Sequence, residues 1–232
     1  MTRSIHPTLL ALKSGLIVSC QAYPGEPMRN PETMAELAES AVIGGAVGIR
    51  AQGPGDIALI HERVRVPQIG LWKVGASGVF ITPTFEHARR VAEAGAEIVA
   101  IDGTRRPRPD GLTLRETINR LHGETGVLVM ADAGSPADGL AAADDGADCV
   151  GTTLSGYTGE RTATDGPDLD MLAQLAGALD VPVIAEGRIH TLQHARDCVS
   201  AGAFALVVGT AITHSASITR WFDGAIRGAT AS

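Results

Sequence analysis

The sequence predicts a single (β/α)₈ barrel, a closed ring of parallel strands that alternates with helices. Three observations support this prediction. A Gly-Ala pair recurs about every 50 residues, and each pair directly precedes a short apolar run. Four further apolar runs lie between these, which makes eight strand candidates. The chain has 232 residues, a normal length for one α/β barrel.

The Gly-Ala pairs mark the expected ends of helices. They stand at positions 45–46, 95–96, 146–147 and 202–203. Glycine just beyond a helix end is the usual C-terminal cap, and a β-branched run after it predicts a buried strand. The expected strands cover residues 15–21, 47–50, 68–73, 97–102, 126–132, 148–152, 182–187 and 204–209.

Helix starts fall between these strands. Asn30 followed by Pro31 predicts an N-cap with proline in the first helical position. Thr84 and Thr191 are the corresponding caps before two later helices. A doubly wound open sheet is the alternative fold, but the glycine-rich turn that is common after its first strand does not follow residues 15–21. Because no linker interrupts the pattern, residues 1–232 are predicted to form one domain.

Composition narrows the class of protein. Hydrophobic residues make up 44% and charged residues 19%, which is typical of globular proteins, and the 3% of aromatic residues predicts an aliphatic core. A net charge of −7 argues against nonspecific binding to nucleic acid or to a membrane surface. No apolar run approaches the about 20 residues that a bilayer requires. The N-terminus also lacks a signal-peptide pattern.

The cysteines predict a reducing compartment. Cys20, Cys149 and Cys198 are widely spaced and odd in number, so a disulfide framework is not expected. Buried, reduced thiols are typical of a cytoplasmic protein. We therefore expect a cytoplasmic location.

Polar side chains close most of the predicted strands. The active site of an α/β barrel lies at the C-terminal ends of its strands. A single polar residue there is often only a solvated strand end, whereas several on one rim indicate a site. This rim set comprises Gln21, Arg50, Lys73, Asp102, Asp132, Glu186 and Arg188.

Two members of the rim set are suited to proton transfer. Lys73 directly follows the apolar residues Ile-Gly-Leu-Trp, and partial desolvation there would lower its pKa and make it a base or a nucleophile. Glu186 follows Pro-Val-Ile-Ala, where neighbouring groups can hold a carboxyl protonated or ionised. The alternative for Lys73 is a side chain that extends past the rim into solvent. The alternative for Glu186 is a salt bridge to Arg188 or Lys73 without a role in proton transfer.

The last two predicted strands end in a candidate phosphate site. Gly187 and Arg188 follow one strand, and Gly209 and Thr210 follow the other. In many barrels these loops bind phosphate through backbone amides and the N-terminus of a short helix. Ordinary turn glycines are the alternative interpretation.

These residues lie within longer strings that resemble the bacterial N-acylglucosamine-6-phosphate 2-epimerase family. The strings run in order over nearly the whole chain. The most specific are Ser-Cys-Gln-Ala-Tyr-Pro-Gly-Glu-Pro at 19–27 and Gly-Thr-Thr-Leu-Ser-Gly-Tyr-Thr at 151–158. The others are at 45–51, 81–84, 106–111, 130–132, 166–168, 182–189 and 207–213.

The resemblance implies an isomerase that interconverts N-acetylmannosamine 6-phosphate and N-acetylglucosamine 6-phosphate in sialic acid breakdown. It implies that Lys73 is the catalytic lysine and Glu186 the essential carboxylate. It implies a homodimer, and it implies no metal, nicotinamide or pyridoxal cofactor. The substrate-binding residues that it implies are Gln21, Arg50, Asp132, Gly187, Arg188, Gly209 and Thr210.

Two positions depart from the family pattern. His214 stands where members usually carry an arginine that contacts phosphate, which leaves a weaker or a pH-dependent phosphate contact as alternatives. The loop after Lys73 is shorter and less charged than in relatives.

The predicted chemistry is proton transfer at C2 of an opened amino sugar. Opening the ring places that proton next to the C1 aldehyde, so the reaction needs a tuned base, an acid and a charge that stabilises the developing oxyanion. Lys73 is the expected base, and Glu186 assists ring opening or returns the proton. One-base and two-base routes both stay open. Rival functions are a Schiff-base aldolase that uses Lys73 and a catalytically silent phosphosugar-binding barrel.

Overall fold

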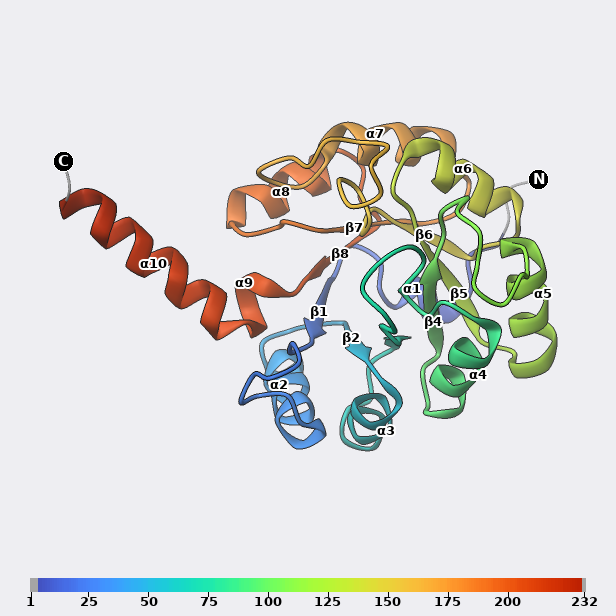
Figure 1. Ribbon diagram of the computed structural model, residues 1–232, viewed down its shortest axis with the longest axis horizontal. Helices are drawn as coiled ribbons and strands as arrows, with labels where there is room; N and C mark the ends of the chain where they lie inside the picture. The colour runs from blue at the N-terminus through green and yellow to red at the C-terminus, as the bar shows by residue number, and fades with distance from the viewer. Residues whose placement is uncertain (1–3, 231–232) are drawn as a thin grey trace.

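The computed structural model describes residues 4–230, and these form a closed barrel of eight parallel strands (Figure 1). Each strand pairs with its sequence neighbours, and β8 pairs with β1 to close the ring. The predicted (β/α)₈ fold is confirmed. The strands are β1 (Leu16–Cys20), β2 (Gly48–Gln52), β3 (Gln68–Leu71), β4 (Ile98–Asp102), β5 (Leu128–Asp132), β6 (Cys149–Gly151), β7 (Val183–Glu186) and β8 (Ala205–Val208).

Helices surround the barrel, and the predicted caps start them. The side chains of Asn30, Thr84 and Thr191 each accept a hydrogen bond from a first-turn backbone amide. The helices are α1 (Pro7–Leu10), α2 (Pro31–Ile43), α3 (Pro54–Arg63), α4 (Phe85–Glu93), α5 (Leu114–Thr125), α6 (Pro136–Asp144), α7 (Leu169–Ala178), α8 (Leu192–Ser200), α9 (Thr210–Thr213) and α10 (Ser215–Thr230).

The recurring glycines end four of these helices. Gly45, Gly95, Gly146 and Gly202 have φ angles of 98°, 107°, 106° and 95°. An L side chain would be strained at such angles, whereas glycine adopts them freely. The alanine that follows each glycine leads the chain back to the next strand. The repeat in the sequence is therefore the capping of every second helix.

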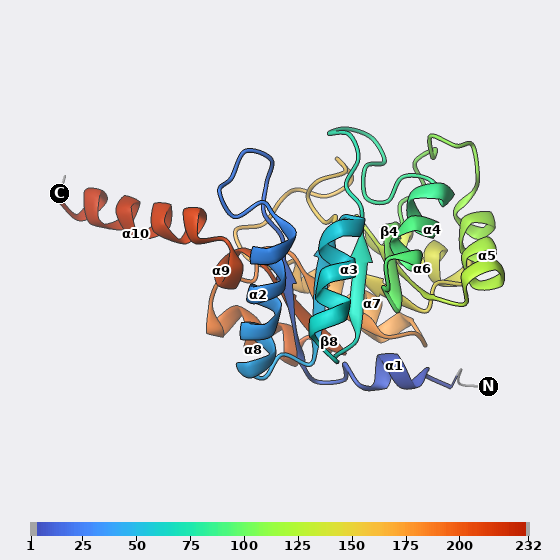
Figure 2. The same ribbon diagram turned by 90° about the horizontal axis from the view of Figure 1, so that it is seen from below.

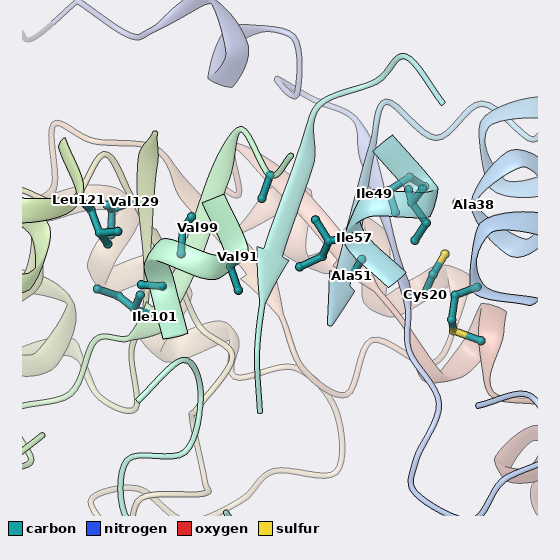
Figure 3. Close-up of a cluster of buried hydrophobic side chains, with 14 of the residues drawn as sticks. Cys20, Ala38, Ile49, Ala51, Ile57, Val91, Val99, Ile101, Leu121 and Val129 are labelled. Atoms are coloured by element: carbon teal, nitrogen blue, oxygen red, sulfur yellow. The ribbon is translucent and has the colours of Figure 1, made fainter. Parts of the chain in front are cut away.

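The strands separate two apolar layers. Outward-facing residues such as Ile49, Ala51 and Val99 pack against the helices (Figure 3). Inward-facing residues such as Ile69, Leu71 and Met130 fill the barrel interior. Because side chains alternate along a strand, the residues that continue the inward series reach the C-terminal rim.

Helix α10 leaves the barrel. It projects away from the other helices in both ribbon views (Figures 1 and 2). Trp221, Phe222 and Ile226 on it are exposed. Within residues 4–230, no helix is both long enough and apolar enough to cross a membrane.

Candidate active site

Strand periodicity brings the key side chains to the C-terminal rim. Ile69 and Leu71 face the barrel interior, and the next residue of that series is Lys73. By the same alternation, Glu186 follows the inward Ile184 on β7, and Asp132 follows Met130 on β5. Lys73 thus rises from the end of β3, opposite Glu186 in the eight-stranded ring.

Arg50 on β2 connects the carboxylates below the rim. Its Nη2 donates to Asp132 Oδ2 at 2.6 Å, and its Nε lies 3.2 Å from Glu186 Oε1. The Arg50 side chain is 1% exposed and that of Asp132 is fully buried. A buried guanidinium needs such partners, because it keeps its charge at any physiological pH. Arg50 therefore holds two acidic side chains from different strands in one place.

Glu186 is well suited to carry a proton. Burial raises the pKa of Glu186 to about 7, against the opposing charge of Arg50 and with a further rise from Asp132. Its carboxyl is 13% exposed and opens on the cleft described below. A carboxyl with this pKa can serve as a general acid near neutral pH.

Lys73 is held at the rim by Gln21. Its Nζ donates to Gln21 Oε1 at 2.8 Å, and Gln21 Nε2 donates to Ser19 Oγ at 2.7 Å. Lys73 is exposed to solvent in the open cleft, although protein atoms crowd its ammonium group. The resulting desolvation lowers the pKa of Lys73, and the charge of Arg50 lowers it further. Both effects favour the neutral amine that a base requires.

Most of the predicted site residues surround one open polar cleft. Arg50 and Asp132 are buried beneath the cleft and form an ion pair with each other. Arg50 also contacts Glu186, which lines the cleft. The predicted residues that line the cleft are Gln21, Lys73, Glu186, Gly187, Arg188, Gly209 and Thr210.

Residues that follow β7 and β8 line one end of the cleft. Gly209 precedes α9, so the amides of Thr210 and Ala211 stand at a helix start, where no intrahelical acceptor exists. Gly209 also lies close to β1: a Cβ added there would stand 3.1 Å from Ser19 Cβ. Gly209 and Thr210 line the same cleft as Gly187.

Arg188 occupies the predicted rim position but directs its guanidinium into a loop. It donates to the carbonyls of Gly166 at 3.0 Å and Ser155 at 2.8 Å, and to Thr164 Oγ1 at 3.1 Å. Its backbone is left-handed, with a φ of 55°. Arg188 thus fastens the loop between β6 and α7 beside the cleft. Sequence reasoning did not anticipate this orientation.

One member of the rim set does not reach the cleft. Asp102 is fully buried, and its carboxylate accepts hydrogen bonds from Thr104 and Arg106 of its own loop. Loop anchoring therefore explains this polar strand end, and the grouping of Asp102 with the site stays a prediction.

His214, at the position where the family pattern has arginine, is also engaged. Its Nε2 lies 2.6 Å from Glu26 Oε1 and its Nδ1 lies 2.7 Å from Ser217 Oγ. Its ring meets that of Tyr23 edge to face, with 5.0 Å between centroids. His214 lines the cleft and ties the loop after β1 to the start of α10.

One residue of the site escaped sequence reasoning. Thr153 Oγ1 lies 2.7 Å from Asp132 Oδ1 and 3.1 Å from Glu186 Oε2. The signal was strand alternation, since Thr153 continues the inward series of Cys149 and Gly151 beyond the end of β6.

Comparison with known proteins identifies the family of the chain. A protein-family model described as "Putative N-acetylmannosamine-6-phosphate epimerase" matches residues 34–228. The chain belongs to this family. The resemblance seen in the sequence strings is confirmed, and the matched region includes Lys73, Arg188 and Glu186, whereas Gln21 precedes it.

Individual relatives extend the match to nearly the whole chain. A Cutibacterium acnes protein named "Putative N-acetylmannosamine-6-phosphate 2-epimerase" is 58% identical over 221 residues, which cover 94% of this chain and 96% of the relative. A protein of the same name from Caldanaerobacter subterraneus is 48% identical over 91% of this chain and 90% of its own. The solved structure of the N-acetylmannosamine-6-phosphate 2-epimerase from Clostridium perfringens superposes with a TM-score of 0.91 at 37% identity, covering 97% of this chain and 98% of that one.

Proposed function

We propose that the protein is an N-acylglucosamine-6-phosphate 2-epimerase, an isomerase that interconverts N-acetylmannosamine 6-phosphate and N-acetylglucosamine 6-phosphate during amino-sugar and sialic acid breakdown. The observation that carries the proposal is the placement of Lys73 and Glu186. They line one cleft from opposite strands, above the buried Arg50–Asp132 pair. Family membership supports the substrate pair, since the relatives are named for it.

The first chemical step is opening of the sugar ring. Glu186 in its acid form gives a proton to the ring oxygen as the bond from C1 to that oxygen breaks. The C1 hydroxyl gives its proton to solvent in the open cleft and becomes the aldehyde, and Glu186 then regains a proton from solvent. The raised pKa of Glu186 supplies the acid form near neutral pH.

The second step is inversion at C2. Neutral Lys73 removes the C2 proton, and the electron pair of the C–H bond forms an enolate with its charge on the C1 oxygen. The positive charge of Arg50, held in place by Asp132, favours that developing charge. A proton then returns to the opposite face of C2 from Glu186 or from the Lys73 ammonium, and ring closure reverses the first step.

The phosphate anchors the substrate at the other end of the cleft. We assign its binding to the amides at Gly187, Gly209 and Thr210, with Arg188 beside them. Gln21 positions Lys73 and the sugar. The binding energy of the phosphate contacts offsets the cost of orienting the sugar at its reacting end.

One assay tests the proposal directly. Purified protein is mixed with N-acetylmannosamine 6-phosphate in D₂O and followed by proton NMR. We expect N-acetylglucosamine 6-phosphate to appear without added metal or cofactor. Loss of all activity after exhaustive EDTA treatment, with recovery on adding a divalent metal, would contradict the cofactor-free mechanism. An unchanged spectrum would favour the silent binding barrel, and trapping of substrate on Lys73 by borohydride would favour the aldolase.

The predicted homodimer has support in α10. Trp221, Phe222 and Ile226 are exposed apolar residues. They belong to a helix that leaves its own barrel (Figure 2). Light scattering should give twice the 23.9 kDa of one chain. A monomer at micromolar concentration would contradict this assembly.

Location in the cytoplasm also remains a proposal. Cys20, Cys149 and Cys198 are free and buried, as predicted for a protein of a reducing compartment. Neither a membrane nor a nucleic acid is among the proposed partners.

A further inference from the structure

Four side chains form a closed ring of polar contacts at the base of the cleft. Arg50 contacts one oxygen of Asp132 and one oxygen of Glu186. Thr153 contacts the other oxygen of each carboxyl group, at 2.7 Å and 3.1 Å. The ring therefore runs Arg50, Asp132, Thr153, Glu186 and back to Arg50. Each member comes from a different strand or strand end.

Counting hydrogens identifies the direction of these bonds. A threonine hydroxyl has one proton to donate and lone pairs to accept with. It cannot donate to two carboxylates at once. The shorter contact is the one to Asp132, whose carboxylate is fully buried and needs a donor at Oδ1 because Arg50 occupies Oδ2. The hydroxyl proton thus belongs to the contact with Asp132.

The contact with Glu186 then requires a proton on the carboxyl group. With its own proton directed at Asp132, Thr153 presents a lone pair to Glu186 Oε2 at 3.1 Å. Two acceptors at that distance repel, whereas a protonated Oε2 donates a normal hydrogen bond. Glu186 Oε1 is the oxygen near the Arg50 guanidinium, which leaves Oε2 as the site for the proton.

We propose that Thr153 is a positioning residue that keeps Glu186 in its acid form, by accepting a hydrogen bond from Oε2–H while donating its own proton to Asp132. The assignment rests on the proposed function, because an acid form of Glu186 matters only if Glu186 delivers a proton to the substrate. Because the charged Asp132 accepts the Thr153 proton, the Thr153 oxygen is free to accept the proton of Glu186.

The charges around Glu186 do not achieve this alone. Arg50 from β2 and Lys73 beyond β3 favour the ionised carboxylate, and Asp132 from β5 favours the acid. Two of these three charges oppose protonation. Burial is the largest cause that favours the acid form, and an acceptor reserved for that form acts in the same direction. A Thr153 hydroxyl that donated to Glu186 would lower the pKa of Glu186 instead, so the hydrogen bond to Asp132 decides the direction of the effect.

The space for this contact depends on a glycine. A Cβ added at Gly151 would stand 3.0 Å from Asp132 Oδ1 and 3.1 Å from Thr153 Oγ1. It would also meet the end of Met130 at 2.4 Å. Glycine at this point of β6 therefore lets the hydroxyl and the carboxylate approach each other.

The neighbouring Thr152 provides a matched control. Its Oγ1 donates to the backbone carbonyl of Glu186 at 2.9 Å and accepts from the Glu186 backbone amide at 3.0 Å. Thr152 thus joins the same two strands without contacting the carboxyl group. Replacing it loosens the strand pair and leaves the proton contact in place.

The test is a titration of the Glu186 carboxyl carbon by ¹³C NMR in substrate-free protein, with Glu186→Gln used to assign the signal. We expect Thr153→Val to lower the pKa of Glu186 by about one unit, because an acceptor that favours the acid form is lost. Thr153→Ser should restore the wild-type value, and Thr152→Val should leave it unchanged. If Thr153→Val does not fold, Thr153→Ala carries the same expectation.

Two results would overturn the proposal. A pKa that stays the same or rises in Thr153→Val would mean that the hydroxyl does not accept a proton from Glu186, and a rise would mean that it donates to the carboxylate. An equal shift in Thr152→Val would mean that strand displacement is the cause. Because the titration needs no substrate, its failure is distinguishable from a failed epimerase assay.

Discussion

Arg50 and Asp132 form an ion pair inside the barrel, with 2.6 Å between Nη2 and Oδ2 and neither side chain more than 1% exposed. Replacing Arg50 with leucine leaves a buried carboxylate without its cation. We expect the free energy of unfolding at pH 7 to fall by about 3–5 kcal/mol, measured by denaturant titration. Arg227→Leu, at an exposed pair with Asp223, should cause no measurable change.

A double variant checks the physical cause of that loss. Replacing Arg50 and Asp132 together removes both charges, so the double variant should be more stable than Arg50→Leu alone. If Arg50→Leu has the same free energy of unfolding as the wild type, the Arg50–Asp132 pair is not desolvated in the way described.

Glu186 should make the protein less stable as the pH rises. The pKa of Glu186 is about 7 in the folded protein, above the 4.5 of an ordinary glutamate, so the folded state binds more protons between these two values. The stability that the acid form contributes is complete below pH 4.5 and is lost as the pH passes through 7. Glu186→Gln removes this dependence.

We therefore expect Glu186→Gln to be more stable than the wild type at pH 8, and the difference to shrink toward pH 5. Denaturant titrations at several pH values measure it. Glu36→Gln, on the exposed face of α2, is the control and should follow the wild-type curve. A gap between Glu186→Gln and wild type that widens toward low pH would show that the sign is wrong.

The sequence could predict the barrel and the strand ends because local rules decide them. Capping at Gly45 and Gly95 and alternation along the strands placed Lys73, Asp132 and Glu186 at the rim. Thr153 was missed because a hydroxyl beyond a strand end carries no charge that marks it.

Other features depend on loops that only the folded chain brings together. Arg188 bonds to Ser155 and Gly166, which lie 33 and 22 positions before it in the chain. Asp102 lies at a polar strand end like Asp132, yet Arg106 of its own loop binds its carboxylate. No spacing in the sequence distinguishes these two aspartates. The assignment of residues 1–232 to one domain stays a prediction.

Lys73→Ala should reduce kcat by at least about 10³-fold, because Lys73 is the one lysine that lines the cleft within residues 4–230, and its positioning by Gln21 is lost with it. Initial rates at saturating substrate measure this. Lys13→Ala, outside the cleft, is the control and should keep wild-type kcat. The proposed mechanism is wrong if Lys73→Ala keeps more than about a tenth of wild-type kcat.

Arg188→Ala should act mainly on substrate binding. Loss of its bonds to Gly166, Ser155 and Thr164 frees the loop beside the phosphate end of the cleft. We expect KM for the phosphorylated sugar to rise, with about 2–4 kcal/mol lost in kcat/KM if a charged contact is lost as well. The unphosphorylated sugar should be a very poor substrate for the wild type. Equal kcat/KM for the two sugars would exclude a phosphate site here.

Deuterium labelling counts the groups that move the proton. Lys73 and Glu186 belong to strands four apart in the ring of eight, so they can flank a substrate from opposite sides. Both line an open cleft. We therefore expect their protons to exchange with solvent. In D₂O we therefore expect product with deuterium at C2 from the first turnover, while unreacted substrate stays protiated.

The fraction of product that keeps its original hydrogen then separates the two routes. If Lys73 removes the proton and Glu186 supplies another, the returning proton comes from a group that never held the substrate hydrogen. Complete deuteration of the first product is the expected result for that route. If Lys73 alone removes and returns the proton, one of the three hydrogens on its ammonium group is the hydrogen taken from the substrate. Some of the product then keeps that original hydrogen at C2. Mass spectrometry of product quenched at under a tenth of conversion measures this fraction. Product that is fully protiated at C2 would contradict exchange at either group and with it both routes.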